Sequence, residues 1–187
     1  MALFKIGWLW VWLVVCFSGR LWGQALPEDT VKDEKKRIEA LLDDLNRYSG
    51  AADFEGYFAL FSEELVFIGT DAGEVWDKDA FKAYAHPHFA KGKAWQFIPL
   101  ERHVYLGGDS GYAWFDELLD TAMGLCRGSG VVEKTASGWR IRQYVLSLTV
   151  PNEAVKAVKE HKASGENYLL ERLRKREEIK KMKNSRK

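Results

Sequence analysis

The chain has 187 residues, of which 47% are hydrophobic, 29% charged and 13% aromatic, and its formal net charge is +1. This composition excludes a disordered, a collagen-like and a multi-pass membrane protein, and it fits one globular domain. The net charge combines three unlike segments. Residues 1–23 contain two basic residues and no acidic one. Residues 24–151 contain 14 basic and 21 acidic residues, and residues 152–187 contain 12 basic and 6 acidic residues. We therefore expect an acidic body followed by a basic tail.

The N-terminal segment has the layout of a secretory signal. A short positive start with Lys5 precedes a mostly apolar run over residues 6–17, and small and polar residues follow. Such a run is too short to span a bilayer comfortably, so residues 1–23 are predicted to be a signal peptide and the chain to be exported, to a periplasm or outside the cell. Because the cleavage site lacks an ideal pair of small residues, an uncleaved segment that anchors the chain is the alternative.

The first part of the body is predicted to contain helices and one hairpin. Apolar residues recur at helical spacing from Val31 to Tyr48 and predict a helix that Gly50 ends. A shorter helix follows from Asp53. Strands over 65–69 and 74–76 flank a turn at 71–73, and Asp77 is a suitable N-cap for a third helix that Pro87 and Gly92 close.

From Ala94 onward the hydrophobic pattern has a period of two. It predicts four long strands over residues 94–106, 112–121, 125–135 and 139–150, and the short Gly-rich links between them suit antiparallel neighbours. Gly128 and Gly130 lie inside the third of these strands, where a bulge would bend the sheet. Helices followed by a strand meander predict an α+β fold with helices on one face of a curved sheet.

Several short motifs resemble a known family. The run from Phe58 to Trp76, the Phe81–Tyr84 helix segment, and the motifs at 114–117, 126–130 and 138–147 resemble a SnoaL-like domain of the nuclear transport factor 2-like superfamily. The resemblance implies a cone-shaped, curved antiparallel sheet wrapped around N-terminal helices, a pocket at the wide end, and a homodimer. It divides the chain into a domain over residues 24–158 and a basic, helical or disordered tail over 159–187. The superfamily contains isomerases, cyclases, dehydratases, kinase association domains and binding proteins, so the fold alone does not settle the function.

Charged residues within apolar strand faces are the candidates for lining the pocket. A charge among apolar neighbours must be paired or must face a cavity. Asp116 and Glu117 lie on opposite faces of one strand, and Asp116 is favoured as the inward acid because Trp114 shares its face. The alternative is that Arg102, Asp116 and Arg127 form a structural ion-pair network or a dimer contact. The predicted ligand-binding residues are Trp76, Arg102, Trp114, Asp116, Arg127 and Tyr144.

Two carboxylates are candidates for a general base. Asp71 follows the strand before the third helix, and Asp116 lies in the predicted pocket; Arg102 or Tyr144 would then stabilise a developing enolate. Asp71 also sits in a Thr-Asp-Ala-Gly turn, where aspartate most often accepts a hydrogen bond from its own backbone.

Metal and cofactor signals are weak. His86 and His88 do not have the spacing of helical metal ligands, and no acid or Cys stands near them in sequence, so we expect no metal site. Nucleotide-binding and nucleophile motifs are absent from the sequence, and we expect no cofactor.

The tail is predicted to begin with a short helix over 152–161 that Ser164-Gly165 breaks. Its basic residues lack the interleaved aromatic side chains that stack on bases, so we expect no nucleic acid partner. Contact with a membrane would occur only through this tail or through an uncleaved N-terminal segment.

Three hypotheses follow from these patterns. The first is an exported protein that binds a small, largely apolar ligand in the cone without demonstrated chemistry. The second is an enzyme of the isomerase, cyclase or dehydratase type, in which a pocket carboxylate acts as general base. The third is an interaction module that dimerises through the outer sheet face and recruits a partner through its tail.

Overall fold

The structure is a computed structural model that describes residues 27–108 and 111–185. The predicted signal peptide, residues 1–23, lies outside the described residues. Among those described, no helix is both long enough and apolar enough to cross a membrane.

Helices α1 (Glu28–Gly50) and α2 (Phe54–Ala59) precede a hairpin of β1 (Phe61–Ile68) and β2 (Val75–Trp76), and helix α3 (Lys78–Phe89) follows it. The side chains of Asp53 and Asp77 accept hydrogen bonds from the backbone N–H groups of Gly56 and Ala80, so both aspartates cap the helices that they precede. Helix α3 runs two residues beyond Pro87, which was expected to close it. The last turn is held in place by Phe89, which is buried in the core.

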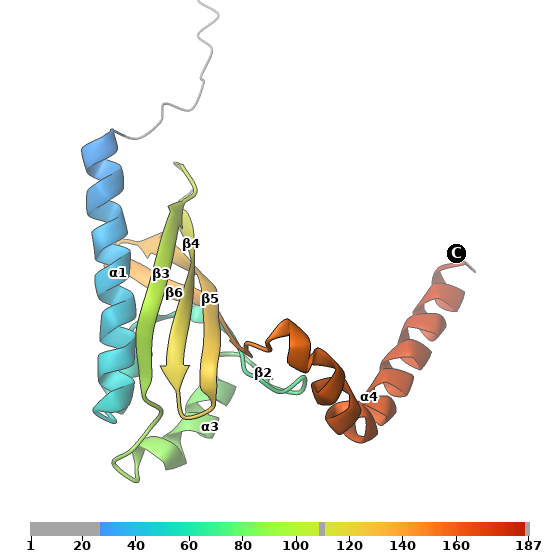
Figure 1. The fold of residues 1–187 in the computed structure, drawn as a ribbon. Coiled ribbons are helices and arrows are strands. Elements are labelled where there is room, and N and C mark those ends of the chain that lie inside the picture. The colour runs from blue at the N-terminus through green and yellow to red at the C-terminus, as the bar shows by residue number, and fades with distance from the viewer. Residues whose placement is uncertain (1–26, 109–110, 186–187) are drawn as a thin grey trace, which may run out of the picture.

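The remaining strands are β3 (Phe97–Leu106), β4 (Tyr112–Thr121), β5 (Gly124–Thr135) and β6 (Gly138–Leu148), so the four predicted long strands are confirmed. Together with the hairpin they form one six-stranded sheet in the order β2-β1-β6-β5-β4-β3. All neighbours are antiparallel except β1 and β6, which run parallel. Figure 1 shows the sheet curving around the helices, with α1 lying along β3. The predicted α+β fold is therefore confirmed.

Irregularities in strand pairing bend the sheet. The β5–β6 register shifts between Val131 and Val132, one residue after Gly130, and the β3–β4 register shifts between Pro99 and Glu101. The shift in β3 leaves Leu100 as an extra residue, so the alternation of side chains reverses there. Ile98 and Leu100 are consequently exposed, whereas Val104 is buried.

The core lies between the helices and the inner face of the sheet. Helix α1 contributes a stripe of buried aliphatic residues, and α2, α3 and β1 contribute a group of aromatic rings. The largest fully buried side chains include Ile38, Leu42, Tyr57, Phe61, Phe81 and Tyr144.

The tail forms a 3₁₀ turn (η1, Asn152–Ala154) and one long helix, α4 (Val155–Asn184). The predicted break at Ser164-Gly165 is wrong, because the helical hydrogen bonding continues through both residues. Figure 1 shows α4 extending away from the body and changing direction along its length, and none of its residues is buried. A Ser-Gly pair is a common cause of such bending.

Candidate functional site

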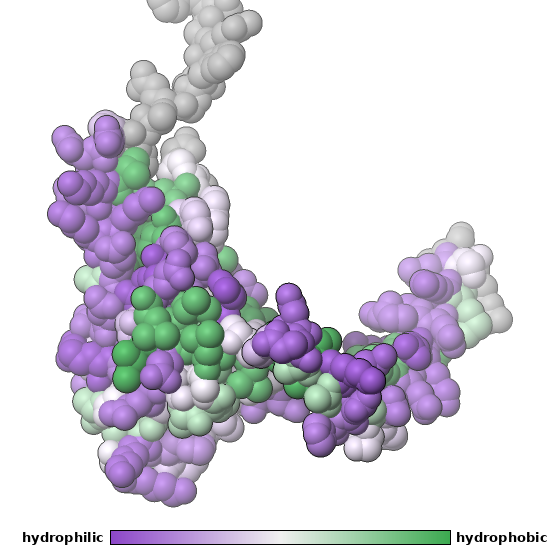
Figure 2. All heavy atoms as spheres, in the orientation of Figure 1, coloured by the Kyte–Doolittle hydropathy of each residue, from purple (hydrophilic) through white to green (hydrophobic). Residues whose placement is uncertain are grey.

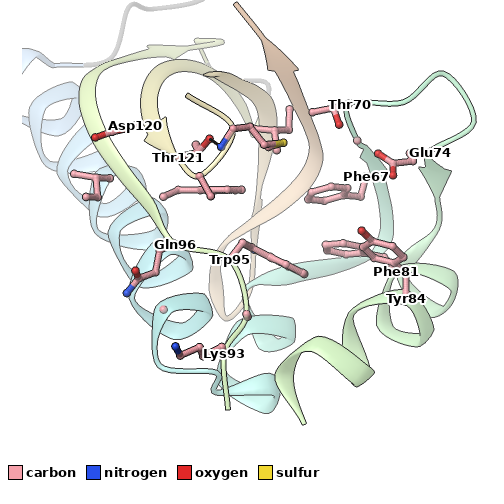
Figure 3. Close-up of a pocket in the computed structure, with 18 of the residues that line it drawn as sticks. Phe67, Thr70, Glu74, Phe81, Tyr84, Lys93, Trp95, Gln96, Asp120 and Thr121 are labelled. Carbon is pink, nitrogen blue, oxygen red and sulfur yellow. Dashed lines mark hydrogen bonds between the residues drawn. The ribbon is translucent and has the colours of Figure 1, made fainter. Parts of the chain in front are cut away.

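A hollow of about 850 Å³ opens at one end of the sheet. One side is formed by β1, β2 and α3, and the opposite side by residues 92–98, which lead into β3, and by the turn between β4 and β5. Figure 3 shows Phe67 and Phe81 of the first side and Trp95 of the second side pointing toward one another. The volume lies in the range of small-molecule binding sites.

Aromatic rings from both sides line the hollow. The rings of Phe67 and Phe81 stack with centroids 3.9 Å apart and an interplanar angle of 15°. Trp76 stacks on Tyr84 at 4.5 Å and 24°, and Phe81 stacks with Trp95 at 5.9 Å and 25°. Each stacked pair is close to parallel, so the rings cover one another's faces. Phe67 and Phe81 are buried, whereas Trp76, Tyr84 and Trp95 keep surface that is exposed. Phe97, Ile98, Met123 and Leu146 add further apolar surface.

Polar groups lie around these rings. The lining includes two carboxylates, Glu74 and Asp120, one ammonium group, Lys93, and the polar side chains of Thr70, Gln96 and Thr121. Oε2 of Glu74 accepts a 3.1 Å hydrogen bond from the backbone N–H of Asp71. Thr121 donates to the carbonyl oxygen of Gly124 at 2.9 Å and accepts from the N–H of Met123, so its hydroxyl orders the β4–β5 turn. Two of the polar groups are therefore engaged in local structure.

Of the six predicted ligand-binding residues, Trp76 lines this hollow. Arg102 and Tyr144 lie deeper, on the inner face of the sheet, while Trp114, Asp116 and Arg127 lie on its outer face. The structure therefore separates the predicted set into three places instead of bringing it together.

The inner face carries a buried polar cluster around Glu117. Its carboxylate accepts a 2.9 Å hydrogen bond from Nε of Arg102 and a 3.0 Å hydrogen bond from the hydroxyl of Tyr144. Arg102 also donates to Asp43 at 2.7 Å and to the carbonyl oxygen of Glu39 at 3.2 Å, both on α1. The cluster joins β3, β4 and β6 to the helix that covers them.

Burial raises the pKa of the Glu117 carboxyl above its ordinary value, although the ion pair with Arg102 and the hydrogen bonds from Arg102 and Tyr144 oppose that rise. Burial and the neighbouring Glu117 charge likewise raise the pKa of Tyr144. Phe67 stacks against Tyr144 at 5.5 Å and itself lines the hollow, so a ring separates the cluster from the hollow.

The expectation that Asp116 points inward is corrected, since Glu117 is the buried acid and is 1% exposed. Asp116 instead pairs with Arg127 at 3.3 Å and with His103 at 3.4 Å on the outer face. Trp114 is exposed there and stacks on Tyr105 at 5.9 Å. Alternation predicted that the two acids face opposite sides but not which side was covered. The signal for Glu117 was its cross-strand pairing with Arg102, which requires the register of β3 and β4.

Asp71 lies in the turn between β1 and β2. Its Oδ1 accepts a 2.8 Å hydrogen bond from the N–H of Gly73, and the side chain is exposed. This is the geometry of a turn-forming aspartate. Asp71 adjoins the hollow through Thr70 and Glu74 but is not part of its lining.

Across residues 27–108 and 111–185, no group of three or more His, Cys, Asp or Glu residues is placed to hold a metal ion. Cys126 is buried between strands, where its thiol lies 3.5 Å from the hydroxyl of Thr121.

A curved six-stranded sheet that encloses helices and opens on an aromatic hollow defines the class of nuclear transport factor 2-like α+β proteins. The profile of the SnoaL-like domain matches residues 38–151, and the chain belongs to this family. None of the curated proteins matches the chain.

Solved structures with the same fold come from several bacteria. A protein from Streptomyces avermitilis, assigned as a dehydratase of the NTF2-like family, is 14% identical with a TM-score of 0.57, covering 65% of this chain and 99% of that one. A protein from Novosphingobium aromaticivorans, assigned as a scytalone dehydratase, is 15% identical with a TM-score of 0.57, covering 65% of this chain and 88% of that one. A domain of unknown function from Nostoc punctiforme is 17% identical with a TM-score of 0.59, covering 75% of this chain and 94% of that one. At these identities the likeness shows the fold alone.

Proposed function

We propose that this chain is a binding protein that holds a small, largely apolar ligand in the hollow. The observation that carries the proposal is the lining, in which the partly exposed rings of Trp76, Tyr84 and Trp95 border a space of about 850 Å³. A planar ligand would bury its faces against Trp76 and Trp95, which are partly exposed, and the polar groups around the rings would set its orientation. The export predicted from residues 1–23 belongs to the same proposal.

The carboxylates that the sequence favoured as general bases, and the buried Glu117, do not reach the hollow as free groups. A general base needs a free carboxylate within hydrogen-bond reach of the ligand. Asp71 accepts a bond within its turn, Asp116 is paired on the outer face, and Glu117 lies behind Phe67 with both oxygens occupied. Of the two carboxylates that line the hollow, Glu74 accepts a hydrogen bond from the N–H of Asp71, so Asp120 is the group that an enzymatic role would need. The dehydratase assignments of two structural neighbours keep an isomerase, cyclase or dehydratase activity as the alternative.

The test is a binding assay with planar ring compounds. The full chain is titrated with anilinonaphthalene sulfonate and with naphthol, anthraquinone and steroid compounds, and tryptophan fluorescence and the melting temperature are followed. Trp76→Leu keeps apolar bulk but removes the flat ring, so we expect binding to weaken about 3- to 10-fold, as for the loss of one stacking contact.

Trp114→Leu is the matched control, because Trp114 is half-exposed on the outer face and should leave binding unchanged. An equal loss of ligand affinity in Trp76→Leu and Trp114→Leu, or no binding of any compound to the wild type, would contradict the proposal. Consumption of a bound compound that Glu74→Gln or Asp120→Asn abolishes would favour the enzymatic alternative.

A further inference from the structure

Helix α4 is a long, solvent-exposed element of the described part of the chain. It spans 30 residues, about 45 Å at the usual rise, and none of them is buried. Its charge is one-sided toward the C-terminal end, where residues 171–184 contain seven basic and three acidic side chains. An isolated polar helix of this kind gains most of its stability from packing against something else.

The negative charge of the body is concentrated in one stretch. Residues 51–81 contain eight acids and one base, whereas the rest of residues 24–151 contains 13 of each. The excess of the whole body therefore comes from α2, β1, β2 and the first turn of α3. These elements pack on one another at the β2 edge of the sheet. We call their carboxylates the acidic corner: Asp53, Glu55, Glu63, Glu64, Asp71, Glu74, Asp77 and Asp79.

The acidic corner is open to a partner. Seven of its eight residues are exposed, and Glu74 is partly exposed. The single cation within residues 51–81, Lys78, is buried and donates to the carbonyl oxygen of Phe61 at 3.1 Å and to Glu63 at 2.9 Å. Lys82, one residue beyond this stretch, also attracts Glu63. Arg142 of β6 pairs with Glu64. Glu55 and Asp79 face solvent beside these groups, so the corner retains a strong negative charge.

We propose that the basic half of α4 docks on the acidic corner of a second copy of this chain. Figure 1 shows the distal half of α4 directed away from its own body, so that half can reach a neighbouring molecule without unwinding. The charges of tail and corner are complementary, and Figure 2 shows hydrophilic residues covering much of α4. Such pairing sets the partner and the orientation of an association.

A membrane surface fits α4 less well. A helix that lies on a bilayer needs one continuous apolar face. With 100° between successive residues, Leu169 and Leu173 fall on one side of α4, and Ile179 and Met182 fall on another. The helix therefore lacks a single apolar face, and attraction between charges is its main means of binding.

The experiment uses two charge-reversal variants of the full chain, purified as the cell produces it. The tail variant carries Arg172→Glu, Arg174→Glu and Arg176→Glu. The corner variant carries Glu55→Lys, Glu64→Lys, Asp71→Lys and Asp79→Lys, which change the net charge of residues 51–81 from −7 to +1. Sedimentation velocity at about 50 mM and about 500 mM NaCl measures association, since the Debye length shortens severalfold over this range. The matched control carries Lys32→Glu, Lys36→Glu and Lys91→Glu, which change the net charge by the same amount as the tail variant but lie outside both the tail and the corner.

We expect the wild type and the control to associate at low salt and to dissociate at high salt. Each reversal variant alone should associate with an affinity at least about tenfold lower than that of the wild type, because its tail and corner then carry like charges. An equimolar mixture of the two variants should associate again, since the acidic tail of one matches the basic corner of the other. Recovery in the mixture also shows that both variants are folded.

Three results would overturn the proposal: a wild type that is monomeric at low salt, association that neither reversal weakens, and a mixture that stays dissociated. Flotation with vesicles of phosphatidylcholine and phosphatidylglycerol gives the last check. Vesicle binding that the tail variant loses, by a chain that remains monomeric in solution, would assign α4 to the membrane and exclude the second copy.

Discussion

The hydroxyl of Tyr144 donates a 3.0 Å hydrogen bond to Oε1 of Glu117, and both side chains are buried. Tyr144 belongs to β6 and Glu117 to β4, so the bond crosses β5, which lies between them. Gly128 of β5 makes this possible. A Cβ atom at this position would lie 2.5 Å from the Tyr144 hydroxyl and 3.0 Å from Cγ of Glu117.

Tyr144→Phe should destabilise the fold by about 1–3 kcal/mol, because it removes one of the two hydrogen-bond donors of a buried carboxylate. Urea unfolding measures the change. Tyr105→Phe is the matched control on the exposed outer face and should cost less than about 0.5 kcal/mol. If Tyr144→Phe lowered the free energy of unfolding as little as the control does, the hydrogen bond from Tyr144 to Glu117 would contribute little to stability.

Gly128→Ala should cost about 1–3 kcal/mol, because the added methyl group overlaps the Tyr144 hydroxyl and Glu117. The same substitution should cost less in a Tyr144→Phe background, where the hydroxyl is absent, so a double-mutant cycle detects the contact. Gly165→Ala in α4 is the control, since nothing lies within 4 Å of the new Cβ and the helix should become more stable. Strict additivity in the cycle would contradict the predicted overlap.

Arg102→Met should destabilise the fold by about 3–5 kcal/mol near neutral pH, because it leaves the Glu117 charge buried without its cation. Burial would then raise the pKa of Glu117 further. A carboxyl whose native pKa is raised adds stability at low pH that is lost as the pH rises through the native pKa. The loss in free energy of unfolding that Arg102→Met causes should therefore be smaller at about pH 5 than near neutral pH.

Arg127→Met is the matched control for that change. Its side chain is half-exposed and pairs with Asp116 on the outer face, so the loss should stay below about 1 kcal/mol at both pH values. A deficit in Arg102→Met that is independent of pH would mean that Glu117 does not take up the proton.

Glu34→Gln should make the chain less sensitive to acid. Hydrogen bonds from Lys134 at 2.9 Å and from the Trp139 indole at 2.6 Å lower the pKa of the Glu34 carboxyl. A carboxyl with a lowered native pKa stabilises the fold above its unfolded pKa, and this contribution is lost as the pH falls through the native pKa. We expect the variant to lose about 1–3 kcal/mol near neutral pH and less than that at about pH 3.

Melting temperatures across this pH range, compared with Glu39→Gln on the exposed side of α1, check the prediction. Parallel curves for the wild type and Glu34→Gln would contradict it.

Local patterns in the sequence predicted much of the fold. Apolar spacing located α1, and the period of two located the four long strands with their turns, because each pattern reflects burial on one side of a regular element. The sequence did not predict the continuous helix α4, since Ser164-Gly165 resembled a break and helix continuity there depends on a small balance of backbone energies. The parallel pairing of β1 with β6 also requires contacts distant in the chain.

For the candidate site, the sequence by itself determined the residue types: aromatic side chains near the hairpin, charges within apolar strands, and an acidic body with a basic tail. Only the tertiary structure decided which of these face one another. The extra residue in β3 reverses its alternation, the β3–β4 register sets Arg102 opposite Glu117, and α1 covers that face and buries the acid. Alternation fixes two opposite faces of a strand, but burial depends on which face another element covers, and that information lies in the packing.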